Sequence, residues 1–175
     1  MATLDLPRTP GCIVCGRNNP HGLALKLQVD AASGTVRTRY TPRAEHIGFI
    51  NIAHGGVLAT VMDEAMVWAA TWARKRFCLC GEMTVRYRRT AGVATALTVE
   101  AKVESQRSKL IQASAEIRDP LNRLIAEATG KYIPLPAEEN QKFMDTMIDE
   151  PATAEAAGAL RSGAEQHSNP NEEPV

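Results

Sequence analysis

The longest apolar stretch of this chain lies near its centre. Residues 57–73 contain only two charged side chains, Asp63 and Glu64, and the apolar residues surround the helical axis instead of keeping to one face. Two consecutive glycines at 55–56 precede the stretch, and the basic segment 74–76 ends it, as suits a helix C-terminus. The pattern predicts a long helix that is covered on nearly all sides.

Alternating apolar and polar positions predict strands before and after this helix. Two strands are expected before it and four after it, at residues 23–29, 35–40, 79–88, 97–105, 110–118 and 124–133. Residues 41–53 read as irregular. One buried helix among antiparallel strands indicates an α+β domain, in which an antiparallel sheet is wrapped around one long central helix.

The chain divides into four segments by composition. Residues 1–21 form an N-terminal arm with a Cys-x-x-Cys turn, and residues 22–136 hold the predicted helix and sheet. Residues 137–150 predict a short C-terminal helix. Residues 151–175 are rich in Ala, Gly, Glu, Ser, Asn and Pro, which bury little apolar surface, so a disordered acidic tail is expected there.

Composition and charge narrow the class of protein. The 175 residues are 44% hydrophobic with a formal net charge of zero, which fits one globular domain. Residues 1–137 carry 18 Lys and Arg against 11 Asp and Glu, whereas residues 138–175 carry 2 against 9. The basic body has no nucleic-acid recognition motif. Without a signal peptide or an apolar run long enough to span a bilayer, a cytoplasmic protein is expected that binds neither nucleic acid nor membrane.

The four cysteines invite a metal interpretation that the spacing supports only in part. Cys12 and Cys15 have the spacing of half a zinc site. Cys78 and Cys80 are one residue apart and would point the same way in a strand, so they do not supply a suitable second half. We therefore expect no metal and no cofactor, and interpret Cys12 and Cys15 as small, half-buried residues in a turn.

The start of the helix and its central carboxylate suggest a chemical role. The first N–H groups of a helix lack intrahelical partners and carry partial positive charge, so the Gly56 end can hold an oxyanion. Asp63 is costly to desolvate as an anion. It lies about 10 Å further along the axis than Gly56, too far for both groups to reach one reacting carbon. We therefore expect a homodimer with antiparallel helices, in which Gly56 of one chain approaches Asp63 of the other.

These residues resemble a known family. The order of the elements, the His54-Gly55-Gly56 start and the Asp63-Glu64 pair look like the hotdog-fold acyl-CoA thioesterases of the PaaI-like group. Cys12-x-x-Cys15-Gly16, with Asn19-Pro20-x-Gly22-Leu23 after it, is similar to the opening of several members. The resemblance covers about residues 12–135 and implies a hotdog fold, an acyl-CoA substrate, and a homodimer or a dimer of dimers.

The resemblance also implies catalytic roles. The backbone N–H of Gly56 would polarise the thioester carbonyl, with Gly55 beside it, and Asp63 would act as nucleophile or as general base on water. A thioester is already activated, so an oxyanion site and one carboxylate can suffice. His54 is expected to fix the turn by hydrogen bonds, although it belongs to the candidate set. Glu64 is expected to be structural or exposed.

Four further residues, Asn51, Cys80, Thr84 and Arg88, are candidates for binding the substrate. Some family members carry Asn or Gln six residues before the His, where this chain has Gly48, so Asn51 or His46 is the candidate replacement. Family position suggests that Cys80 or Thr84 approaches the carboxylate. Arg88, in a basic cluster at the end of its strand, is a candidate for contact with the phosphates of coenzyme A.

Two other functions share the predicted fold. A non-catalytic acyl-CoA-binding protein would keep the pocket and not need Asp63. A hotdog acyl-thioester dehydratase or hydratase would need a His or an Asp/His pair placed for proton abstraction, which the spacing of His54 and Asp63 does not clearly offer.

Overall fold

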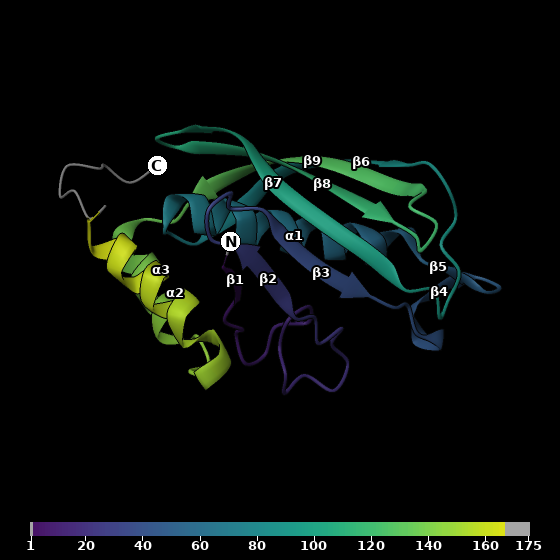
Figure 1. The fold of residues 1–175 in the computed structure, drawn as a ribbon, viewed down its shortest axis with the longest axis horizontal. Coiled ribbons are helices and arrows are strands. Elements are labelled where there is room, and N and C mark those ends of the chain that lie inside the picture. Colours follow the sequence, from purple (N-terminus) through teal and green to yellow (C-terminus); the bar gives the residue numbers. More distant parts are fainter. Residues whose placement is uncertain (1, 167–175) are drawn as a thin grey trace.

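The computed structural model describes residues 2–166. One antiparallel sheet of seven strands, in the order β1-β2-β3-β7-β8-β9-β6, packs against a single long helix, α1 (Figure 1). The strands of this sheet are β1 (Thr3–Asp5), β2 (Leu27–Asp30), β3 (Val36–Tyr40), β6 (Cys78–Tyr87), β7 (Leu97–Arg107), β8 (Leu110–Arg118) and β9 (Leu124–Pro134). The predicted hotdog fold, an antiparallel sheet around a long helix, is confirmed.

The central helix α1 (Gly55–Arg74) follows from its sequence. His54 caps its N-terminus, and Lys75 ends it in the left-handed conformation, with a φ of 57°. Ten of its residues are buried, on nearly all sides of the axis: Leu58, Val61, Met62, Ala65, Met66, Trp68, Ala69, Ala70, Thr71 and Trp72. They pack against apolar positions of β3, β6, β7, β8 and β9, so the apolar stretch forms the core as predicted.

The segment before α1 is more ordered than the sequence suggested. It contains a 3-10 turn, η1 (Ala44–His46), and a small hairpin of β4 (Ile47–Phe49) and β5 (Ile52–Ala53). Asn51 makes the hairpin turn possible with a φ of 60°. The side chains of Phe49 and Ile50 at its tip are 79% and 87% exposed. Figure 1 shows this hairpin near the N-terminal end of α1.

The N-terminal arm also contributes to the sheet. Its residues 3–5 form β1, which pairs with β2 and was not predicted. The predicted strand at 23–29 is only partly correct, because β2 begins at Leu27 and Ala24 has a φ of 52°. The N–H groups of Leu23 and Leu25 instead donate to the carbonyls of Ile13 and Val14, so this segment pairs with the Cys-x-x-Cys turn.

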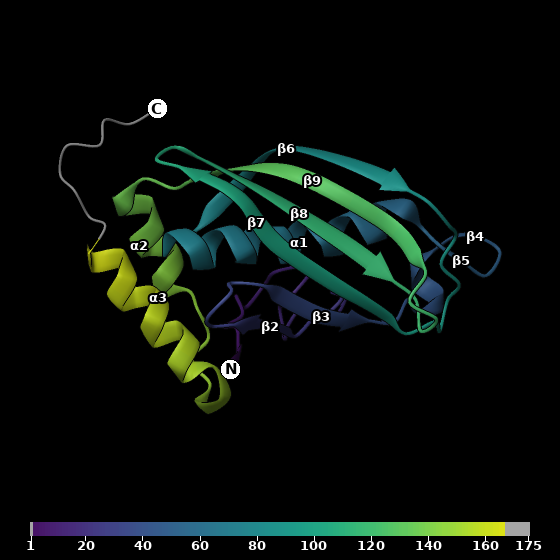
Figure 2. The same cartoon turned by 45° about the horizontal axis from the view of Figure 1, so that its top comes forward.

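The C-terminal segment differs from the expectation of disorder. The short helix α2 (Ala137–Asp145) is followed by η2 (Pro151–Thr153) and by α3 (Ala154–Gln166). Residues 151–166 are therefore ordered, and residues 167–175 of the expected disordered tail lie outside the described residues. Both views show α2 and α3 together at the end of the molecule opposite the β4–β5 hairpin (Figures 1 and 2).

Small side chains explain why α3 packs. Ala156, Ala157, Leu160 and Ala164 recur at helical spacing and are buried, although their total apolar surface is modest. The side chain of Lys75, at the end of α1, covers Gly163 so closely that a Cβ there would lie 2.4 Å from the Lys75 Cγ. No helix within residues 2–166 is both long and apolar enough to cross a membrane.

Candidate active site

The N-terminus of α1 is closed by its own capping residue. The N–H of Gly56 donates to Nδ1 of His54 at 2.9 Å, and the N–H of Val57 donates to the His54 carbonyl at 3.0 Å. The imidazole thus occupies the N–H that the sequence assigned to an oxyanion. A thioester oxygen reaches the Gly56 N–H only if the His54 ring moves aside or shares the donor.

Gly55 and Gly56 both lie so close to aromatic rings that a side chain at either position would be crowded. A Cβ on Gly56 would lie 3.0 Å from the His54 ring, and a Cβ on Gly55 would lie 3.1 Å from the ring of Tyr87. The hydroxyl of Tyr87 donates to the Gly55 carbonyl at 2.7 Å. The end of β6 therefore packs directly on the first turn of α1, and this contact fixes where the helix starts.

Asp63 lies two turns further along α1 and is partly buried. The hydroxyl of Tyr132 donates to its Oδ1 at 2.9 Å. Tyr132 is fully buried on β9, and burial, followed by the negative charge of Asp63, raises the pKa of its hydroxyl, so it stays a donor. Gly130 leaves room for the aromatic ring, because a Cβ there would lie 2.7 Å from Tyr132 Cε2.

Tyr132 was not among the site residues predicted from the sequence, although its position in β9 carries a signal. The alternation along β9 puts Tyr132 on the same face as Ala128 and Ala126, which point to the helix. A single large polar-tipped residue after small ones on that face indicates a hydroxyl aimed at the helix. Which group on the helix accepts its hydrogen bond depends on the tertiary packing.

Cys80 and Thr84 of β6 face opposite sides of the sheet. A register shift between Cys80 and Glu82 marks a bulge at Gly81, which changes the alternation. Cys80 is the β6 partner of Tyr132, and burial together with the nearby Asp63 charge raises the pKa of its thiol. Thr84 is exposed beside the inward-packed Met83, on the face away from α1. Of these two candidates, the structure brings Cys80 and not Thr84 close to the Asp63 carboxylate of the same chain.

The remaining candidates lie apart from Asp63. Asn51 is exposed at the β4–β5 turn, where its carbonyl accepts from the N–H of Val93. The guanidinium of Arg88 donates from Nε to Glu127 Oε1 at 3.1 Å, so it already has an acidic partner on the same sheet. His46 is buried, and its Nδ1 accepts from the N–H of Arg43 at 3.1 Å.

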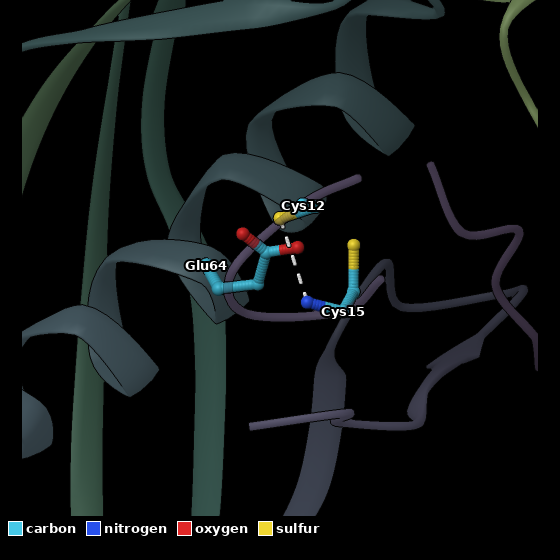
Figure 3. A group of neighbouring side chains, drawn as sticks. All are labelled: Cys12, Cys15 and Glu64. Carbon is cyan, nitrogen blue, oxygen red and sulfur yellow. Dashed lines mark hydrogen bonds between the residues drawn. The ribbon is translucent and has the colours of Figure 1, made fainter. Parts of the chain in front are cut away.

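Glu64 faces a different part of the molecule from Asp63. Nε1 of Trp68 donates to its Oε1 at 3.0 Å, and the carboxylate lies beside Cys12 and Cys15 of the N-terminal arm (Figure 3). Burial, followed by the charge of Cys12, raises the pKa of Glu64 to about 7. The interaction between the two thiols lowers the pKa of Cys12 and raises that of Cys15.

An open groove lies on another part of the surface. It is bordered by basic and polar side chains of the 23–28 segment, of β3 and of the residues that follow β3, among them Lys26, Arg39 and Arg43. None of the predicted site residues lines it. The candidate active site is therefore the flank of α1 between Gly56 and Asp63, together with the edge strand β6.

The fold and these groups define a hotdog domain, and comparison with known proteins supports the same class. Residues 50–126, from the β4–β5 hairpin into β9, match the thioesterase superfamily. A curated relative, a putative esterase of Archaeoglobus fulgidus, is 26% identical over 102 residues, which are 58% of this chain and 66% of the relative.

Solved structures agree on the fold. A thioesterase superfamily protein aligns with a TM-score of 0.66 and 22% identity, over 71% of this chain and 60% of that protein. The PaaI protein of the phenylacetic acid degradation operon of E. coli aligns with a TM-score of 0.59 and 20% identity, over 65% of this chain and 80% of PaaI. A Streptococcus mutans protein bound to acetyl-CoA aligns with a TM-score of 0.59 and 14% identity, over 63% of this chain and 88% of that protein.

These matches confirm the predicted resemblance to the hotdog-fold thioesterase superfamily. The aligned region spans less than two thirds of the first two relatives, the archaeal putative esterase and the thioesterase superfamily protein. The resemblance therefore concerns the helix and sheet of this domain.

Proposed function

We propose that this protein is an acyl-CoA thioesterase that hydrolyses a thioester to a free acid and coenzyme A. The observation that carries the proposal is the Asp63 carboxylate, which lies on the buried central helix and is oriented by the buried hydroxyl of Tyr132. A carboxylate held in this way costs desolvation energy, and a reaction that uses it as base or nucleophile explains that cost.

The edge of the sheet supports a shared site between two chains. Among the described residues, β6 is an edge strand of ten residues that pairs with β9 on one side only, and its Leu79 and Tyr87 are 53% and 51% exposed. A long free edge readily pairs with another strand. In our proposal a second copy pairs along β6, its α1 runs antiparallel to the first, and Gly56 of one subunit approaches Asp63 of the other.

The chemistry then needs few groups. The thioester carbonyl accepts from the Gly56 N–H after the His54 ring moves aside. As a general base, Asp63 takes a proton from water, and the resulting hydroxide attacks the carbonyl carbon. The tetrahedral oxyanion collapses, the C–S bond breaks, and the proton passes from Asp63 to the coenzyme A thiolate. As a nucleophile, Asp63 would instead attack the carbonyl carbon, the C–S bond would break to release the coenzyme A thiolate, which takes a proton from solvent, and water would hydrolyse the resulting anhydride to the free acid and Asp63.

Structural relatives support the substrate class. The Streptococcus mutans protein is bound to acetyl-CoA, and a Streptococcus pneumoniae protein, 16% identical with a TM-score of 0.56, is in complex with coenzyme A. Cys80, Thr84, Asn51 and Arg88 remain proposed substrate contacts. Thr84 lies on the face of β6 away from its own α1, so it would contact a substrate bound at the site of the partner subunit.

The experiment is thiol release from a panel of short, medium, long and aryl acyl-CoAs. We expect the wild type to hydrolyse one class, and Asp63→Asn to lower kcat/KM at least about a hundredfold, which is about 2.7 kcal/mol of transition-state stabilisation. Glu100→Gln is the matched control, because Glu100 is an exposed acid on β7 that pairs with Arg37 and lies outside the candidate site, and it should retain wild-type activity.

The hydrogen bond between His54 and the Gly56 N–H favours a second candidate function, acyl-CoA binding without hydrolysis. Because His54 occupies the Gly56 N–H, the protein as described is also compatible with acyl-CoA binding without turnover. If neither wild type nor Asp63→Asn releases thiol while both bind acyl-CoA with the same Kd, the protein is an acyl-CoA-binding protein, and the thioesterase proposal is wrong.

A further inference from the structure

Two backbone N–H groups of the Cys-x-x-Cys turn donate hydrogen bonds to the sulfur of Cys12. The N–H groups of Val14 and Cys15 donate to Sγ of Cys12 at 3.3 and 3.5 Å. Gly16 closes the turn, with its N–H donating to the Cys12 carbonyl at 3.0 Å. A Cβ on Gly16 would lie 2.3 Å from that carbonyl oxygen, so the turn requires glycine there. Two N–H donors aimed at one sulfur favour its thiolate, the form that binds metals.

A third ligand group comes from α1, far away in the sequence. One ligand atom each of Cys12, Cys15 and Glu64 lies within 4.8 Å of the others. Figure 3 shows the Glu64 carboxylate extending from the helix towards the loop that carries both thiols. Cys78 and Cys80 are not part of this cluster, and the fold supplies the Glu64 carboxylate as the third group instead.

The Glu64 side chain is held in position for binding. The indole N–H of Trp68 donates to Oε1 at 3.0 Å. Metal-binding side chains are commonly fixed by such an outer hydrogen bond, which limits the cost of ordering them. Cys12 and Cys15 are acidic thiols, and the sulfur of each lies within 4.8 Å of a Glu64 carboxylate oxygen. A cation at this point would offset their mutual repulsion.

We propose that Cys12, Cys15 and Glu64 bind a zinc ion, with water in the fourth position. Two thiolates favour zinc over magnesium or calcium, which prefer oxygen ligands, and the carboxylate completes a mixed set that zinc accepts. Tetrahedral zinc with bonds of about 2.0–2.3 Å needs ligand atoms about 3.5–3.8 Å apart. Small side-chain rotations bring atoms within 4.8 Å of one another to that spacing.

Zinc at this place would tie the N-terminal arm to the central helix. The arm already pairs with residues 23–25, and Arg8 bonds both oxygens of Glu150 from the C-terminal segment. The ion would add a direct link from this layer to α1, next to Asp63 in sequence but on another face of the helix. Binding involves no change of oxidation state, and the thiol protons pass to solvent as the ion is bound.

The test uses the full chain, freed of metal by a chelator and kept reduced. Zinc is titrated in competition with a chromophoric chelator, and cobalt(II) serves as a second probe, because thiolate ligands give it a near-ultraviolet charge-transfer band. We expect one zinc per chain, the cobalt band, and a higher Tm with zinc. Cys12→Ser should abolish the band, and Glu64→Gln should weaken zinc binding about tenfold or more.

The control variant is Cys80→Ser, which removes an exposed thiol outside the cluster and should bind zinc like the wild type. If Cys12→Ser does not fold, Glu64→Gln still decides, because it preserves the shape of the side chain and its folding is checked by circular dichroism. The proposal is overturned if reduced wild type binds no zinc, if Glu64→Gln binds it as tightly as wild type, or if Cys80→Ser loses it.

Discussion

Asp63 and Glu64 are neighbours on α1, yet they lie in two different environments. Successive residues of a helix point about 100° apart, so Asp63 faces β6 and β9 while Glu64 faces the N-terminal arm. The hydrogen bond from Tyr132 holds the first carboxylate, and the hydrogen bond from Trp68 holds the second. The pair that resembles one catalytic motif thus consists of two acids with separate partners.

Tyr132 is a positioning residue in this arrangement. Tyr132→Phe removes the donor to Asp63 Oδ1 and leaves the ring in place. We expect kcat to fall about tenfold with KM nearly unchanged, because a freely rotating carboxylate is less often oriented for attack. In the Asp63→Asn background the same change should have little further effect, which a double-mutant cycle measures.

Tyr40→Phe is the control for Tyr132→Phe. Tyr40 is buried as well, and its hydroxyl lies 2.8 Å from Nδ1 of His46, away from Asp63. Each variant should lose about 1 kcal/mol of unfolding free energy with its hydrogen bond, but only Tyr132→Phe should lower kcat. Equal kcat for the two variants would show that Tyr132 contributes to stability alone.

His46 links stability to pH. Burial lowers its pKa below the usual value of a histidine, and its Nδ1 accepts from the Arg43 N–H, which requires the neutral ring. As pH falls through the unfolded pKa, the unfolded chain takes up a proton that the folded chain resists. Stability is therefore lost as pH falls from about 7.5 to about 5.5.

Urea unfolding at several pH values tests this dependence. The slope of unfolding free energy against pH should be smaller for His46→Gln than for wild type, whereas His21→Gln, which replaces an exposed histidine, should keep the wild-type slope. An unchanged slope in His46→Gln would mean that other groups account for the loss of stability in acid.

At the scale of elements, apolar stretches and polar–apolar alternation predicted the helix and the longer strands. The apolar stretch of α1 and the alternation of β3 and β6 to β9 gave elements within a few residues of those observed. β1 was missed because three residues carry too little alternation to recognise. The β4–β5 hairpin was missed because its side chains at 47, 49 and 50 are exposed, and its pairing depends on the turn at Asn51.

The candidate site likewise contains residues that are close in sequence and could be predicted, and partners that are distant in sequence and could not. His54, Gly56 and Asp63 lie within ten residues of one another, so a helix start and its spacing make them visible in sequence. Tyr132 is 69 residues from Asp63, and Glu64 is more than 40 residues from either cysteine of the arm. Such partners meet only when the sheet and the arm pack on α1, and sequence pattern alone does not pair them.

α3 was missed because alanine contributes little apolar surface to a composition count. Its stability depends on close packing, which Leu160→Ala tests directly, since Leu160 is fully buried. We expect a loss of about 2–5 kcal/mol of unfolding free energy, measured by urea unfolding. Ser162→Ala, an exposed position of the same helix, should change stability by less than about 0.5 kcal/mol. A similarly small effect of Leu160→Ala would mean that α3 unfolds independently of the rest.

At the scale of the whole molecule, one chain does not complete the proposed site. Gly56 and Asp63 lie on the same helix, about 10 Å apart along its axis. Tyr87 and Tyr132 fix the two positions against the sheet, so the chain has no freedom to bring them together. Hydrolysis by our mechanism therefore requires two subunits, and two defective subunits should complement each other.

Complementation is tested with Gly56→Pro and Asp63→Asn. Proline in the first turn of a helix is tolerated, and it removes the N–H that the mechanism uses. Each variant alone should be inactive. After dissociation and random reassembly of an equal mixture, half of the dimers combine the two chains, and each of these has one intact site, so activity should return to about one quarter of wild type.

Gly56→Ala keeps the N–H and controls for the added bulk, because its Cβ meets only the His54 ring. It should retain far more activity than Gly56→Pro, and circular dichroism and mass measurement should show both as folded dimers. If the mixture stays inactive although mass measurement demonstrates mixed dimers, the proposal is wrong. Either Gly56 and Asp63 then act in the site of the same subunit, or one of them takes no part in the reaction. Recovery near one quarter requires an active site that uses Gly56 of one chain and Asp63 of its partner, since no other pairing in the mixture contains both groups intact.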